Sequence, residues 1–122
     1  MQKKILFIDD EPVVATLMKS RIESHGFLVE TASGGASALE KAKAWQPDLI
    51  LLDVIMPGMD GYETCRRLKA MKETAHIPVV LFTAAQETHL EAMAQKAGAA
   101  RVVQKPFVDL VFKAIEEILA PQ

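Results

Sequence analysis

Three aspartates follow apolar stretches of the chain, at positions where buried strands would end. Asp9 and Asp10 come directly after residues 5–8, and Asp53 comes directly after residues 49–52. Three carboxylates brought together repel one another unless a cation holds them. Mg²⁺ prefers octahedral oxygen ligands, keeps several waters and often joins carboxylates to a phosphate. The pattern therefore predicts a magnesium site that these aspartates share.

Two further polar residues follow apolar stretches. Thr83 comes after residues 79–82, and Lys105 comes shortly after residues 102–103. A hydroxyl group and a lysine charge are groups that bind phosphoryl oxygens. A carboxylate in such a site can act as the nucleophile and form an aspartyl phosphate, without a separate base. We expect that nucleophile to be Asp53, because it follows the most apolar stretch, whereas Asp9 and Asp10 can share the metal.

These residues need a scaffold that brings the ends of separate strands together. Continuous apolar runs at residues 5–8, 49–52, 79–82 and 102–103 are typical of parallel strands covered on both faces, and the mixed segment 28–32 is typical of an edge strand. Between the strands the apolar spacing becomes helical. The helical stripes contain Val14, Leu17, Met18 and Ile22; Leu39, Ala42 and Trp45; Cys65 and Leu68; Leu90, Met93, Ala94 and Ala97; and Val108, Val111, Phe112, Ile115, Ile118 and Leu119.

The alternation of strand and helix predicts one α/β domain over residues 1–122, a doubly wound (βα)5 sandwich of three layers around a parallel five-stranded sheet. Such sheets bind ligands beyond the carboxyl ends of their strands. The aspartates, Thr83 and Lys105 all fall at that edge.

Composition excludes several classes of protein. With 14 Lys and Arg against 16 Asp and Glu, the net charge is −2, which argues against direct nucleic-acid binding over the whole surface. The single Cys65 cannot form an internal disulfide and falls on an apolar helical stripe. The apolar run after Lys3 and Lys4 stops at Asp9, too short for a signal peptide or a membrane span. We therefore expect a cytoplasmic protein without a membrane partner.

Some residues have simpler interpretations. Asp10 could cap the helix that follows it, and Asp60 with Gly61 is more typical of a turn and a helix start than of a site. Arg66 and Arg67 belong to a run that Glu63 flanks, so a solvated helix face is favoured over a phosphate-binding patch. The three histidines show no spacing typical of a zinc site.

Four motifs together resemble the receiver domain of two-component response regulators. They are the Asp9-Asp10 pair, the stretch 51–61 that reads LLDVIMPGMDG, Thr83-Ala84, and Lys105-Pro106-Phe107. The resemblance spans nearly the whole chain, and the combination in this order is highly specific. It implies a flavodoxin-like fold with strand order 2-1-3-4-5. One position departs from the pattern, because Val102 stands where receivers usually have an aromatic residue.

The resemblance also implies a function. Asp53 would accept a phosphoryl group from a histidine kinase or a histidine phosphotransfer protein, and the domain would then switch conformation. Asp10, Asp53 and the backbone carbonyl of Ile55 would hold Mg²⁺, with Asp9 acting mostly through water. Thr83 and Lys105 would bind the phosphoryl group, and the Lys105-Pro106 peptide would be cis. The protein would act on its own aspartate only and would not be an enzyme in the usual sense.

Two other functions remain open at this point. One is an interaction scaffold that phosphorylation does not regulate, and the other is a small aspartyl-phosphate phosphatase. The phosphatase is disfavoured because Asp9-Asp10-Glu11 lacks the DxD spacing of the haloacid-dehalogenase type. We expect no output domain, since only residues 120–122 follow the last helical stripe, and a monomer, since that stripe lacks the charge pattern of receivers that dimerise there. The downstream target is not indicated by the sequence.

Overall fold

The structure, a computed structural model, describes residues 2–83, 89–104 and 108–119. Its strands form one parallel sheet in the order β2-β1-β3-β4-β5, which confirms the predicted fold class and strand order. The strands are β1 (Lys4–Ile8), β2 (Leu28–Ala32), β3 (Leu49–Asp53), β4 (Val79–Thr83) and β5 (Arg101–Gln104). The strand order reverses between β1 and β3, which is where ligands bind in doubly wound sheets.

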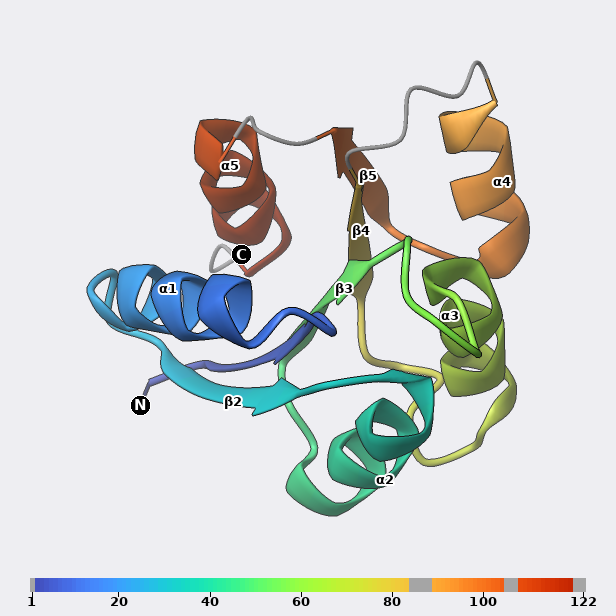
Figure 1. Ribbon diagram of the computed structural model, residues 1–122, viewed down its shortest axis with the longest axis horizontal. Helices are drawn as coiled ribbons and strands as arrows, with labels where there is room; N and C mark the ends of the chain where they lie inside the picture. The colour runs from blue at the N-terminus through green and yellow to red at the C-terminus, as the bar shows by residue number, and fades with distance from the viewer. Residues whose placement is uncertain (1, 84–88, 105–107, 120–122) are drawn as a thin grey trace.

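The helices cover both faces of this sheet (Figure 1). They are α1 (Pro12–Glu23), α2 (Gly35–Trp45), α3 (Gly61–Ala70), α4 (Leu90–Ala97) and α5 (Val108–Leu119). Residues of α1 and α5 pack on one face, and residues of α2, α3 and α4 pack on the other. The domain therefore has the three predicted layers.

Each face of the sheet carries its own apolar core. Ile5 and Phe7 of β1 pack in the core beside α1 and α5, whereas Leu6 and Ile8 pack in the core on the opposite face. Successive side chains of a strand point to opposite faces, so both sets must be apolar when helices cover both sides. This explains the continuous apolar runs in the sequence, and every residue of β3 and β4 is buried.

Local sequence signals set several helix ends. Gly26 after α1 and Gly98 after α4 have φ angles of 91° and 88°, in the left-handed region that favours glycine. Asp60 is the N-cap of α3, and its side chain accepts a hydrogen bond from the amide of Glu63, as the sequence predicts. At α1 the N-cap is Glu11 and makes no side-chain capping bond, so the alternative role of Asp10 as a helix cap is wrong.

The predicted buried stripe of α1 is wrong at one position. Ile22 is buried, and Val14 and Met18 are half-buried, but the side chain of Leu17 is 61% exposed. Consecutive residues of an α-helix lie about 100° apart around its axis, so Leu17 points well away from Met18. Only a narrow side of α1 contacts the sheet, and Leu17 lies outside it.

Two other features concern the surface. Glu63 forms ion pairs with Arg66 and Arg67 at 2.7 and 3.0 Å, which confirms the solvated helix face and lowers the pKa of the Glu63 carboxyl.

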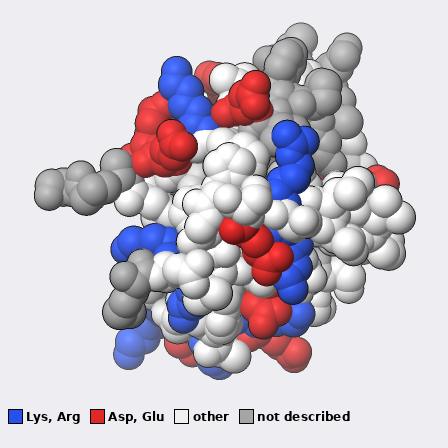
Figure 2. All heavy atoms as spheres, turned by 90° about the vertical axis from the view of Figure 1, so that its left-hand side faces the viewer, with Lys and Arg blue, Asp and Glu red and all other residues white. Residues whose placement is uncertain are grey.

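Figure 2 shows one side of the molecule, on which acidic and basic side chains are interspersed with uncharged ones. Within the part of the chain that the structure describes, no helix has the length and apolar character needed to cross a bilayer.

Cys65 gives a test of the packing. Its side chain is fully buried, its Sγ donates to the carbonyl oxygen of Ala97 at 3.3 Å, and burial raises the pKa of the thiol from 9.0 to about 11. We therefore expect the folded protein at pH 8 to resist a thiol reagent that labels the unfolded chain in urea. Because the pKa is raised in the folded state, stability should fall as the pH rises from 9 towards 11. Labelling of the folded protein at the rate of a free thiol would contradict this packing.

Candidate phosphoacceptor and metal site

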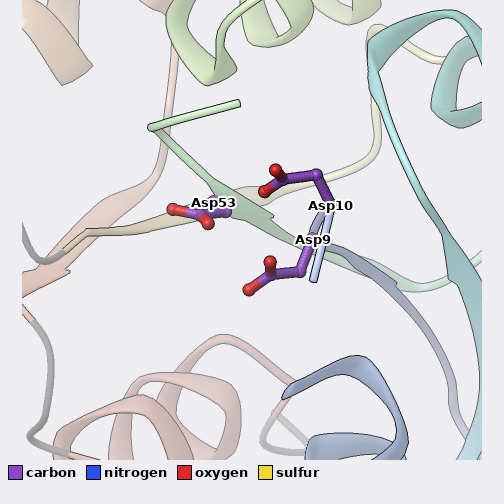
Figure 3. A group of neighbouring side chains, drawn as sticks. All are labelled: Asp9, Asp10 and Asp53. Atoms are coloured by element: carbon purple, nitrogen blue, oxygen red, sulfur yellow. The ribbon is translucent and has the colours of Figure 1, made fainter. Parts of the chain in front are cut away.

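Three carboxylates meet at the carboxyl edge of the sheet. Asp9 and Asp10 follow β1, and Asp53 is the last residue of β3, which pairs with β1. One carboxylate oxygen of each residue lies within 4.8 Å of the other two. Figure 3 shows the three side chains directed to the same side of the strand ends. The convergence is thus observed, whereas the role of each aspartate as a ligand stays a prediction.

Backbone amides orient two of these carboxylates. The Oδ1 atom of Asp9 accepts a hydrogen bond from the amide of Glu11 at 3.0 Å, and Oδ1 of Asp53 accepts one from the amide of Ile55 at 3.2 Å. Asp9 and Asp53 are only 2% and 4% exposed, and Asp10 is half-buried. The amides stabilise negative charge in a place that water hardly reaches.

The charges and donor atoms fit a hard divalent cation. Two like charges about 5 Å apart near a protein surface repel each other by on the order of 3 kcal/mol, and this site contains three such pairs. The clustered donors are all carboxylate oxygens, which suit Mg²⁺ better than zinc. A groove lined by Asp9, Asp10, Thr16, Lys19 and Ser33, among others, lies beside the cluster.

Thr83 lies at the same edge of the sheet. It is the last residue of β4, and its side chain is fully buried. Phe82 is the register partner of Asp53 across β3 and β4, so Thr83 stands one residue further towards the site. This is the edge that the sequence predicts for a hydroxyl that binds a phosphoryl group. Lys105, and with it the expected cis peptide to Pro106, lies outside the described residues.

The segment that follows Asp53 also helps to form the site. The amide of Ile55 donates to Asp53, while the Ile55 side chain is 58% exposed. The amide of Val54 donates to the carbonyl of Phe82 at 3.1 Å, and the amide of Gly61 donates to the carbonyl of Val54 at 2.8 Å. The sequence pattern predicts only a helix start at Gly61. The sequence feature that could have indicated the contact between Gly61 and Asp53 is the glycine directly after the N-cap residue Asp60.

Val102, the residue that departs from the receiver pattern, lies in the sheet. Val102 lies in β5, is partly buried and packs against the core on the side of α2, α3 and α4. Arg101, the residue before it, forms an ion pair with Glu117 of α5 at 2.7 Å. With valine at this position, β5 contains no aromatic residue.

Comparisons with known proteins agree with this geometry. The family model of the response regulator receiver domain matches residues 5–116. The chain is similar to the alkaline phosphatase synthesis transcriptional regulatory protein PhoP of Bacillus subtilis, with 41% identity over 128 residues. That alignment covers 99% of this chain and 52% of PhoP, so the chain spans about half the length of this relative.

Two solved structures have the same architecture. The chemotaxis protein CheY4 of Vibrio cholerae has a TM-score of 0.90 and 27% identity, and the match covers 98% of this chain and 100% of that one. The BeF3-activated receiver domain of Klebsiella pneumoniae RstA has a TM-score of 0.83 and 30% identity, with 95% and 98% covered.

The fold, the acidic cluster and the family match lead to one assignment. Receiver domains take phosphoryl groups from histidine kinases, and an acidic cluster at the end of β1 and β3 fits a phosphoacceptor site. The chain therefore belongs to the response regulator receiver family, as a phosphorylation-activated signalling domain of two-component systems.

Proposed function

We propose that Asp53 accepts the phosphoryl group, from a phosphohistidine of a histidine kinase or of a histidine phosphotransfer protein. Mg²⁺ is held by Asp10, Asp53 and the backbone carbonyl of Ile55, and Asp9 acts through water. The observation that carries this proposal is the meeting of three carboxylates within 4.8 Å at the switch point of the sheet. Without a phosphoryl group and a cation to bind, such a concentration of like charge has no physical advantage.

In the proposed step, a carboxylate oxygen of Asp53 attacks the phosphorus atom of the phosphohistidine. The new P–O bond forms as the P–N bond breaks, and the released imidazole nitrogen takes up a proton. The amide of Ile55 holds the Asp53 carboxylate, the hydroxyl of Thr83 donates to a phosphoryl oxygen, and Lys105 pairs with the phosphoryl charge. Mg²⁺, when bound, supplies positive charge that offsets the carboxylates and the phosphoryl oxygens. The domain thus catalyses only its own phosphorylation and dephosphorylation.

The location of the donor follows from an exposed apolar surface. Val13 and Leu17 of α1 are 71% and 61% exposed, and α1 begins two residues after Asp10. Large apolar side chains that stand open beside a reactive site are typical of a protein docking surface. We place the phosphodonor on this part of α1. The family resemblance implies that the phosphodonor contacts this helix together with residues 106 and 107, which lie outside the described residues.

The same proposal includes the wider setting of the protein. A cytoplasmic monomer without direct contact to nucleic acid or membrane fits a net charge of −2 and the interspersed surface charges. An unregulated scaffold is the second candidate, but no described feature favours it over the receiver. The phosphatase is disfavoured further, because the family consists of signalling domains. The downstream target is left open.

Phosphorylation at Asp53 can be tested with beryllofluoride, a mimic of the aspartyl phosphate. We expect amide NMR signals near Asp10, Asp53 and Thr83 to shift when Mg²⁺ and beryllofluoride are added together, because the mimic binds the Asp53 carboxylate. In Asp53→Ala the beryllofluoride shifts should vanish. Unchanged spectra of the wild type would leave the unregulated scaffold as the better explanation.

The repulsion between the carboxylates makes a second prediction. In EDTA, Asp10→Asn should raise the free energy of unfolding by about 1 to 2 kcal/mol, or roughly 4 to 8 °C in the unfolding midpoint. Addition of Mg²⁺ should stabilise the wild type more than the variant, because the variant has lost a ligand. Glu23→Gln is the matched control, since it removes an exposed negative charge at the far end of α1. Equal responses of the two variants would argue against a shared cation site.

The docking surface is tested by Leu17→Ser. Its effect on stability should be within about 0.5 kcal/mol because the side chain is exposed, whereas the rate of phosphotransfer from a phosphorylated histidine phosphotransfer protein should fall about 10-fold. Leu28→Ser is the control, since Leu28 is also exposed but begins β2 at the opposite edge of the sheet. Phosphorylation by the small donor phosphoramidate should be unchanged in both variants. A loss with phosphoramidate as well would place Leu17 in the chemistry and not in docking.

A further inference from the structure

Helix α3 begins in direct contact with the backbone of the phosphoacceptor residue. A Cβ atom built on Gly61 would lie 2.3 Å from the carbonyl oxygen of Asp53 and 2.6 Å from the Cα atom of Val54. Both are backbone atoms of the β3 end, which cannot rotate away as the tip of a side chain can. Gly61 has no positive φ angle, so the position requires glycine for space and not for backbone conformation.

This contact closes the segment that carries the site. The amide of Val54 is bonded to Phe82 of β4, and the amide of Gly61 is bonded back to the carbonyl of Val54 at 2.8 Å. Between these two bonds lies Ile55, whose amide donates to Oδ1 of Asp53 at 3.2 Å. The nucleophile and the proposed carbonyl ligand of Ile55 therefore belong to a loop that ends where Gly61 contacts Asp53.

The start of α3 is itself held in place. Oδ1 of Asp60 accepts the amide of Glu63 at 2.9 Å, and the carbonyl of Asp60 accepts both the amide and the hydroxyl of Thr64 at 3.0 and 2.8 Å. Cys65 and Leu68, further along α3, are fully buried in the core. The helix thus offers a rigid support for the loop, and Gly61 transmits its position to Asp53.

We propose that Gly61 is a positioning residue for the acidic site: by letting α3 lie against the Asp53 backbone, it sets where the Asp53 carboxylate and the Ile55 carbonyl stand. The inference rests on the proposed function, because it concerns the residues assigned there to Mg²⁺. It goes beyond that function because it assigns a positioning role to a residue that has no side chain. A displacement of about 1 Å in such a site can cost up to 100-fold in activity.

Two other glycines of the chain provide matched controls. Gly98 has a φ of 88°, so an alanine there is strained, and the atoms nearest to its Cβ belong to the side chain of Lys69, at the far end of α3 from Gly61. A Cβ on Gly34 would have nothing within 4 Å, and its φ of −175° suits any residue. Gly98→Ala therefore reports a loss of stability away from the site, and Gly34→Ala reports the effect of an added methyl group alone.

The experiment measures the Mg²⁺ dissociation constant by NMR titration and the unfolding midpoint for each variant. We expect Gly61→Ala to weaken Mg²⁺ binding by about 10-fold or more. Gly98→Ala should lower the midpoint yet keep the Mg²⁺ constant within about 2-fold, and Gly34→Ala should change neither. In metal-free protein, the amide signals of Asp53, Val54 and Ile55 should shift in Gly61→Ala and not in Gly98→Ala.

A second pair of variants covers the case in which Gly61→Ala does not fold. Asp60→Ala and Asp60→Asn remove the same charge, but asparagine still caps a helix and alanine does not. If α3 positions the loop, Asp60→Ala should weaken Mg²⁺ binding about 3-fold relative to Asp60→Asn. Equal Mg²⁺ binding in the two Asp60 variants, or wild-type binding in Gly61→Ala, would overturn the inference. A wild type that binds no Mg²⁺ would instead refute the proposed function, and the metal-free amide shifts would still decide the role of Gly61.

Discussion

Asp9, Asp10 and Asp53 repel one another, and the fold has to hold them together against that repulsion. Carboxylates that lie within 4.8 Å of one another in a partly dry site oppose folding, and the protein must hold them there in spite of that cost. They are held because they lie at the carboxyl ends of β1 and β3, which are paired with each other in the sheet. In the proposed function, a bound cation offsets this unfavourable charge, and the phosphoryl group is transferred to the same place.

Burial of the apolar sheet stabilises the fold and offsets the repulsion among the three carboxylates. Every residue of β3 and β4 is buried, and the sheet has a separate core on each face. Burial of this kind is the dominant favourable term in folding. A sheet with one solvated face would have polar residues at alternate positions and a smaller core to set against the charge. The three-layer architecture is thus well suited to hold three repelling carboxylates at one edge of the sheet.

The loop between β3 and α3 connects the chemistry to the helical layer. It carries Ile55 next to Asp53 and returns to the strand end at Gly61, where a side chain of any size would collide with backbone. Within the described chain, the acidic site is therefore supported from the sheet on one side and from α3 on the other. The contact at Gly61 thus joins the backbone of Asp53 directly to the start of α3.

The amino-acid sequence is enough to predict the strand and helix alternation, the three aspartates and the helix ends at Gly26, Asp60 and Gly98, because these follow from spacing and local backbone preferences. It could not determine that Leu17 points to solvent, since helical spacing alone does not say how wide a side of α1 the sheet covers. Nor could it show that Gly61 lies against Asp53, because the approach of α3 to the end of β3 is decided by packing between segments. Residue types decided which chemistry is available, and only the tertiary structure decided which groups meet.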